Sequence, residues 1–421
     1  MKHPAERLLG PLSEAELERV KTIDKILPQL REHAAEADVT ATFHMPNAEL
    51  IKESGLTGLV IPTDFGGMGG GLRDLCAATY TLGMADPSTA LIYFFSNSAS
   101  SRGLLTLAAI EAGLFTDEEI PQVKGFAEKV LTRMGKEKRL IGNFASESSK
   151  NEKQAITIST KATRTEGGWL LNGVKSFGTG TDVCDMYLIS AGIDGVAGLD
   201  GIGTFFVPRD AEGVKARAPW DPIGLRASAS NGLTLENVFV PDDEAMAVPG
   251  AFRRMMEVSR GSFVGNQVAA ICCYLGGGQA VYDWVIQFLT ERTFADTGQP
   301  IGSSPMHQEL IGKMAVDLET GYLWLRRQIE LETSDPPLLP KEEVIKQWRT
   351  CKGASTEALF NVAVLGLKAC GTGNTANRGA LVRGLRDLSM GLVQAFPAER
   401  GRLEAAKMIV TGGFTPSFGT E

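Results

Sequence analysis

The chain has 421 residues, of which 43% are hydrophobic, so it is long enough to bury a large core divided into two or three domains. Its 42 basic and 50 acidic residues give a formal net charge of −8, which argues against nucleic acid or an anionic membrane surface as the main partner. The charged N-terminal stretch and the lack of a run of about 20 apolar residues predict a cytoplasmic protein without a membrane span.

The six cysteines show no CxxC spacing, and the four histidines form no HxxxH pair. We therefore expect reduced, mostly buried thiols and no metal site. The cysteines are Cys76, Cys184, Cys272, Cys273, Cys351 and Cys370.

The first third of the chain has a helical pattern. From Ser13 to about Gly142, apolar residues recur at spacings of three and four, which predicts an N-terminal helical domain over residues 1–142. Glycines between Gly66 and Gly71 interrupt this pattern with an ordered loop. Asp86 followed by Pro87 predicts the start of a helix, with the aspartate as its cap.

Between residues 143 and 245 the apolar period changes to two, which predicts a central β-domain with the form of a small barrel or sandwich. Asn172-Gly173 favours a tight turn, so we expect a hairpin between strands at 169–171 and 174–177. The small residues 178–181 follow, where a flat heterocyclic ligand can approach the backbone and its hydroxyl groups.

Long helical patterns return over residues 246–421, at about 252–290, 306–333, 341–369 and 377–393. They predict an antiparallel four-helix bundle. The fold class is therefore α+β and multidomain, with the order helical domain, β-domain, helical bundle. No GxGxxG motif joins a strand to a helix, so a Rossmann nucleotide site is not supported.

Six segments in this order resemble motifs of the acyl-CoA dehydrogenase superfamily of flavoproteins. They are the Pro62 to Gly69 loop, Asp86-Pro87-Ser88, the 172–177 strand, residues 223–241, Ser259-Arg260, and the spacing from Gly371 to Arg386-Asp387. The resemblance covers nearly the whole chain.

The resemblance implies FAD as cofactor. It places Ser146, Phe177 and Thr179 against the isoalloxazine ring. It assigns the pyrophosphate and adenine to a set of residues from another subunit, and hence implies a homotetramer or at least a dimer. That set is Arg292, Phe294 and Gln308, with Gly371 and Gly373 allowing close approach of the backbone. The Arg292–Gln308 interval is longer here than in typical dehydrogenases.

The family's catalytic glutamate has no counterpart at either usual position, which here are Ala395 and Ser259. A dehydrogenase of this family needs a carboxylate to remove the α-proton of an acyl thioester. The nearby Glu399 and Glu257 are displaced by four and two residues, and both fit a helix-start or surface charge better.

The resemblance also implies a small acyl substrate, linked to CoA in the usual members, with Arg260 and Ser96 as candidate contacts. The glycine-rich loop that shapes the acyl-CoA channel is replaced by residues 146–153, which retain no glycine. Binding of CoA in the usual manner is therefore in doubt. Lys150 and Lys153 are either solvated or contacts for an anionic group.

Three hypotheses follow. The first is an acyl-thioester oxidoreductase with a non-standard or relocated base, for which an electron-transferring flavoprotein is the implied acceptor. The second is a monooxygenase of the same fold that uses reduced flavin and O2, although the stretch 389–399 lacks the histidines that such members often carry. The third is a catalytically silent scaffold that binds flavin.

Overall fold

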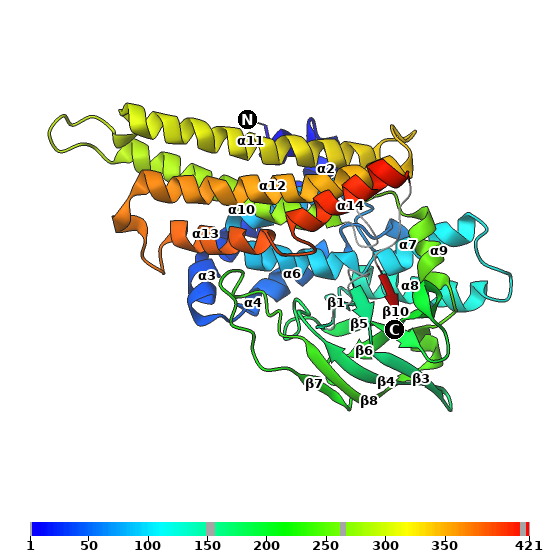
Figure 1. The fold of residues 1–421 in the computed structure, drawn as a ribbon. Coiled ribbons are helices and arrows are strands. Elements are labelled where there is room, and N and C mark those ends of the chain that lie inside the picture. Colours follow the sequence, from blue (N-terminus) through cyan, green and yellow to red (C-terminus); the bar gives the residue numbers. More distant parts are fainter. Residues whose placement is uncertain (1, 149–155, 262–266, 413–417, 421) are drawn as a thin grey trace.

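The computed structural model describes residues 2–148, 156–261, 267–412 and 418–420. Figure 1 shows a layer of long helices packed over a twisted sheet, with the first helices of the chain between and behind them. This is the predicted order of helical domain, β-domain and helical bundle. The N-terminal helices are α1 (Ala5–Leu9), α2 (Glu14–Asp24), α3 (Leu27–Thr40), α4 (Pro46–Glu53), α5 (Leu72–Ala85), α6 (Pro87–Ser98), α7 (Ser101–Glu111) and α8 (Ile120–Gly135).

Local signals account for several helix starts. Ser13 caps α2 in a capping box with Glu16. The carboxylate of Asp86 accepts hydrogen bonds from the backbone N–H groups of Ser88 and Thr89, which confirms the predicted start of α6. Two short 3-10 turns lie in the loop ahead of α5, at Leu56–Gly58 and Thr63–Phe65.

The central part of the chain forms one mixed sheet with the strand order β7-β8-β4-β3-β5-β6-β9, and β1 pairs with β5. Its strands are β1 (Ile141–Phe144), β3 (Lys161–Thr165), β4 (Gly168–Lys175), β5 (Met186–Ile193), β6 (Ile202–Pro208), β7 (Val214–Ala216), β8 (Leu233–Pro241) and β9 (Ala245–Met246). The short strands β2 (Ile156–Ile158) and β10 (Phe418–Thr420) pair in parallel.

The hairpin predicted at Asn172-Gly173 is wrong. Strand β4 runs straight through this dipeptide, and its pairing with β8 shifts register between Leu171 and Gly173, as at a β-bulge. A Cβ at Gly173 would lie 2.4 Å from the Thr160 hydroxyl, so the glycine serves close strand packing. The turn lies earlier, between β3 and β4, where Thr165 pairs with Gly168.

The C-terminal helices are α9 (Ala251–Val258), α10 (Gln267–Glu291), α11 (Pro305–Thr333), α12 (Lys341–Cys370), α13 (Ala380–Gly391) and α14 (Ala398–Thr411). The single helix predicted over 252–290 is therefore wrong at its beginning, because the chain leaves the helix at Ser259, whose backbone is extended. α10 to α13 run side by side in alternating directions (Figure 1).

Small residues bring α5 and α10 together. A Cβ at Gly276 would lie 2.1 Å from the Tyr80 carbonyl oxygen, so a larger residue would force these helices apart. All six cysteines are buried and free, which confirms that expectation.

Candidate functional site

The residues that follow β4 form an exposed aromatic corner. Phe177 has a positive φ of 56° and remains 55% exposed, both unusual for a large apolar side chain. Its ring meets that of Trp220 edge to face, with centroids 5.2 Å apart. Exposed aromatic surface beside small residues fits the apolar part of a flat ring system such as a flavin.

Hydroxyl groups line the same corner. Thr179 Oγ1 lies 3.0 Å from Ser230 Oγ, which lies 2.8 Å from Ser228 Oγ. The two loops that carry them are held together because Gly180 and Thr181 donate backbone hydrogen bonds to Ser228 and Ala229. All three side chains are buried, so these hydroxyls bond to one another beneath the exposed ring of Phe177.

A buried ion pair lies beneath the corner. Lys175 Nζ is 2.5 Å from Glu147 Oε1, and both side chains are almost fully buried. Glu147 also accepts hydrogen bonds from the backbone N–H groups of Ser159 and Thr160. Burial alone would raise the pKa of Glu147, but Lys175 and the two hydroxyls hold it low, whereas burial lowers the pKa of Lys175 to about 8.

The pair fixes the segment that carries Ser146, whose side chain is exposed and whose carbonyl accepts a hydrogen bond from Ser176 N–H. The structure thus places the three predicted ring contacts Ser146, Phe177 and Thr179 on adjoining segments. Lys150 and Lys153 lie outside the described residues.

The predicted dinucleotide contacts lie elsewhere in the chain. Arg292, Phe294 and Gln308 flank the α10–α11 connection, where the Arg292 guanidinium lies 5.8 Å from the Phe288 ring and Phe294 packs on His307. In Figure 1 this connection projects from the left end of the bundle, away from the strands.

Gly371 and Gly373 follow α12 and are exposed, with open space where a Cβ would point. They lie where α12 turns back into α13, at the same end of the bundle (Figure 1). One chain therefore does not bring the two groups of predicted cofactor contacts together.

Neither residue at the two positions that the resemblance assigns to the base is acidic. Ala395 is exposed with a φ of 63°, and Ser259 is half-buried after α9. The displaced glutamates are both exposed and both paired. Glu257 accepts from Arg253 at 2.5 Å, and Glu399, in the first turn of α14, accepts from Arg402 at 3.0 Å.

The loop around Ala395 is held by residues that the sequence reading missed. Lys352 on α12 is fully buried and donates hydrogen bonds from Nζ to the carbonyl oxygens of Gly391 (2.8 Å) and Phe396 (2.5 Å). Burial lowers its pKa to about 8. The hydroxyl of Tyr274 donates to the side chain of Gln394. Lys352 stands among apolar and small residues of a helical pattern, and this placement is the one sequence feature that indicates a buried lysine.

The two candidate substrate contacts lie in different places. Ser96 is buried, and its hydroxyl accepts a hydrogen bond from Ile141 N–H at 3.0 Å. Arg260 lines a cleft of about 570 Å³ and donates to the Ser334 carbonyl oxygen at 2.6 Å.

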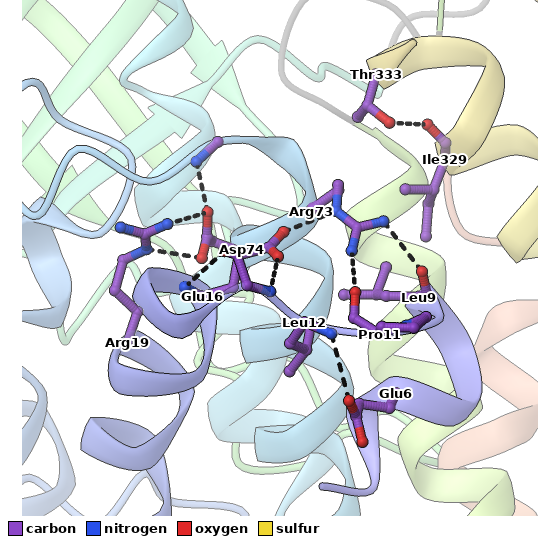
Figure 2. A network of polar contacts seen from close by, with 12 residues as sticks. Glu6, Leu9, Pro11, Leu12, Glu16, Arg19, Arg73, Asp74, Ile329 and Thr333 are labelled. Carbon is purple, nitrogen blue, oxygen red and sulfur yellow. Dashed lines mark hydrogen bonds and ion pairs between the residues drawn. The ribbon is translucent and has the colours of Figure 1, made fainter. Parts of the chain in front are cut away.

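Paired side chains form the wall of this cleft. Figure 2 shows Arg19 bound to Asp74, with Nε to Oδ1 at 2.7 Å, and Arg73 bound to Glu16 and to the carbonyl oxygens of Leu9 and Pro11. Since each arginine already holds an acid, we interpret this network as one that joins α2 to α5 rather than as a catalytic group.

Among the helices that the structure describes, none is long and apolar enough to cross a membrane. In the same part of the chain, no three metal-ligating side chains come together.

Comparison with known proteins agrees with the architecture. Three family models match consecutive parts of the chain: acyl-CoA dehydrogenase, N-terminal domain over residues 16–111, middle domain over 145–238, and C-terminal domain over 256–393. YdbM of Bacillus subtilis (strain 168), whose name marks it as a provisional acyl-CoA dehydrogenase, is 24% identical over 378 residues, 89% of this chain and 91% of that protein.

Relatives with other named activities also match. The amino sugar nitrososynthase RubN8 of Streptomyces rubradiris is 26% identical over 273 residues, 64% of this chain and 60% of that protein. The structure of dibenzothiophene monooxygenase (TdsC) from Paenibacillus sp. A11-2 superposes with a TM-score of 0.78 and 18% identity, covering 95% of this chain and 99% of that one. The architecture, the motifs and the three matching models lead to one conclusion: the chain belongs to the acyl-CoA dehydrogenase superfamily of flavoenzymes.

Proposed function

We propose that the protein is a flavin-dependent oxidoreductase that works without a carboxylate base, and that it oxidises a small organic substrate with O2 as a monooxygenase. When bound, the flavin supplies two-electron redox chemistry. The chain contributes an apolar wall (Phe177 and Trp220) over the hydroxyls of Thr179 and Ser230, with the buried pair of Lys175 and Glu147 keeping both in place.

One observation carries this proposal: the residues at the two base positions, Ala395 and Ser259, cannot take up a proton at neutral pH. A general base must lie within hydrogen-bonding reach of the proton that it removes. The two displaced glutamates are exposed and held by Arg253 and Arg402, so neither has the desolvated position of a tuned base.

The second candidate is an oxidoreductase for acyl thioesters with a relocated base. Its support is the match to YdbM, which extends over 89% of this chain. In this case one of the two displaced glutamates, Glu257 or Glu399, would have to leave its arginine on substrate binding.

We further propose FAD as the cofactor. Arg292, Phe294 and Gln308 form a second polar and aromatic group at the bundle end, suited to a diphosphate and an adenine. FMN has no adenylate to place there. TdsC has been solved with FMN and indole, so the choice needs a direct test. Heat release followed by chromatography against FAD and FMN standards identifies the flavin, and release of FMN alone would contradict this assignment.

The activity test separates the two candidates. We expect the purified protein to be yellow, and its flavin absorbance to remain unbleached when saturated and unsaturated acyl-CoAs of increasing length are added without oxygen. After chemical reduction, admitted O2 should reoxidise the flavin, and a panel of small heteroaromatic and amine substrates should yield an oxygenated product with less free H2O2.

Matched variants make each outcome decisive. Bleaching by an acyl-CoA that disappears in Glu399→Gln or Glu257→Gln would establish the second candidate instead. Protein that cannot be reconstituted with either flavin would contradict both.

A further inference from the structure

Arg102, near the start of α7, is a buried cation without a partner. Its side chain is 3% exposed, and its Nε and Nη1 atoms make no hydrogen bond. No carboxylate of the described residues pairs with it, and its guanidinium lies over the Phe252 ring, whose centroid is 5.0 Å from Cζ. Burial lowers the pKa of Arg102 to about 10, so it stays charged at neutral pH.

Comparable arginines of this chain are satisfied. Arg254 also lies over a phenylalanine, with Cζ 4.8 Å from the Phe115 ring, but it binds both oxygens of Glu119 at 2.7 and 3.0 Å. Arg386 binds both oxygens of the buried Asp38. An unpaired buried cation is costly. We therefore infer that a bound anion, not a side chain of the described residues, balances the charge of Arg102.

The surroundings of Arg102 are polar. On the helix side it lies one turn after Ser98 and one turn before Thr106. Ser98 accepts a hydrogen bond from the Asn143 side chain of β1 at 3.1 Å, and Thr106 contacts the sulfur of Met246 on β9 at 3.7 Å. These contacts place Arg102 over the strands between β1 and β9.

Two further buried atoms on that sheet face lack partners, namely Asn143 Oδ1 and Thr204 Oγ1. Thr204 pairs in register with Met246, so its side chain points to the same side as the one that Thr106 contacts. β1 leads within two residues of its end to Ser146, the predicted ring contact. The polar region and the aromatic corner are therefore connected through one short strand.

We propose that Arg102 binds the carboxylate end of a small substrate or ligand, in a buried site between α7, α9 and the sheet. The identification of this ligand as the substrate rests on the proposed function. The presence of an anion site at Arg102 does not. A single guanidinium with neutral Thr204 and Asn143 balances one negative charge, which suits a carboxylate better than a dianionic phosphate.

The test measures ligand-induced stabilisation of the full protein. Butyrate, hexanoate and octanoate, each at constant ionic strength, should raise the Tm of the wild type by a few degrees, whereas the neutral amides of the same length should not. Arg102→Met should weaken the apparent Kd for the carboxylates by about 10- to 100-fold. Tm is also measured with chloride and with sulfate, which detects a site that binds any small anion.

Arg254→Met is the matched control, because it removes an arginine that is also stacked on a phenylalanine but is paired. Without added ligand, Arg254→Met should lower the Tm, whereas Arg102→Met should leave it unchanged or raise it, since an unpaired buried charge is removed. Equal responses of wild type and Arg102→Met to every carboxylate would overturn the proposal. So would stabilisation by chloride or sulfate alone, or a fall in Tm for Arg102→Met as large as that for the control.

The measurement distinguishes this proposal from the function above. Protein that contains flavin but shows no Arg102-dependent anion effect refutes the anion site only. Protein that binds carboxylates through Arg102 but takes up no flavin refutes the function only.

Discussion

At the scale of single residues, the ion pair of Lys175 and Glu147 links the two segments that lead to the exposed aromatic corner. Five other groups make hydrogen bonds to this pair. The Ala145 carbonyl oxygen accepts from the lysine, and the N–H and hydroxyl groups of Ser159 and Thr160 donate to the carboxylate. Ser146 directly precedes Glu147, and Phe177 lies two residues after Lys175. The ion pair therefore holds the backbone on both sides of the corner.

Removing one partner of this pair should be much worse than removing both. We expect Lys175→Met to lower the free energy of unfolding by about 3–5 kcal/mol and to reduce flavin content, because a buried carboxylate loses its counter-charge. Urea unfolding checks this value. The double variant Lys175→Met with Glu147→Gln should recover part of the loss, and a double variant less stable than Lys175→Met would show that the pair is not the cause.

The sequence predicted part of the site at this scale. Phe177 and Thr179 lie in or beside the small-residue stretch 178–181 that predicted contact with a flat ligand, and the structure places them on segments adjoining Ser146. Trp220 and Ser230 could not be found this way, because their contact partners Phe177 and Thr179 lie 43 and 51 residues earlier in the chain, and no local pattern indicates such a contact. Arg102 and Lys352 were missed since a buried charge looks, in sequence, like a surface charge on a helix.

At the scale of elements, the loop between β7 and β8 is attached to α13. The Leu225 N–H donates to Asp387 Oδ1 at 2.7 Å, and a Cβ at Gly224 would lie 2.0 Å from the Arg386 carbonyl oxygen. Arg386 in turn binds Asp38 on α3. The Arg-Asp pair singled out in the sequence thus joins three elements, and it holds the loop that carries Trp220 and Ser230.

Asp387 makes this junction sensitive to pH. Burial raises its pKa from 3.8 to about 7, despite the hydrogen bond from Leu225. Because the folded pKa exceeds the unfolded one, the folded state takes up a proton. Its contribution to stability is therefore complete below about pH 4 and is lost as the pH rises to about 7.

We accordingly expect Asp387→Asn, which keeps the acceptor oxygen without a charge, to gain stability relative to the wild type as the pH rises. The gain from pH 5 to pH 8 should be on the order of a few kcal/mol, measured by urea unfolding at both values. Asp38→Asn is the control, because it breaks the ion pair with Arg386 and should destabilise at both pH values. A constant difference between Asp387→Asn and the wild type would refute this assignment.

Helices and strands were predicted correctly where a single hydrophobic period dominates the sequence. They were missed where tertiary contacts determine the local backbone. The start of α6 follows from Asp86-Pro87, since capping and proline act locally. The Asn172-Gly173 signal gave a wrong hairpin because pairing with β8 and close contact with Thr160 keep β4 extended. The end of α9 was missed because neither Val258 nor Ser259 is a residue type that usually ends a helix.

At the scale of the whole molecule, the arrangement of the bundle decides whether one chain can bind its cofactor alone. The alternating directions of α10 to α13 place the α10–α11 and α12–α13 connections at one end, away from the sheet, whose strand β4 precedes Phe177 (Figure 1). Fold class and element order could be predicted from sequence because three successive periodicities encode them. The boundaries 1–142, 143–245 and 246–421 and the oligomeric state remain predictions.

If FAD spans both groups, its ring end and its adenine end must be held by different copies of the chain. Phe177→Ala combined with Thr179→Ala should then abolish flavin binding at the ring end, and Arg292→Glu should abolish it at the other end. When the two variant chains are co-expressed with different tags and purified through both, each mixed pair contains one site built from intact halves. We expect flavin absorbance to return in that fraction only, since each variant purified alone has no intact site. Mixed pairs that stay colourless, while doubly tagged wild type is yellow, would mean that each chain holds its own flavin and that Arg292 acts on the ring site only indirectly.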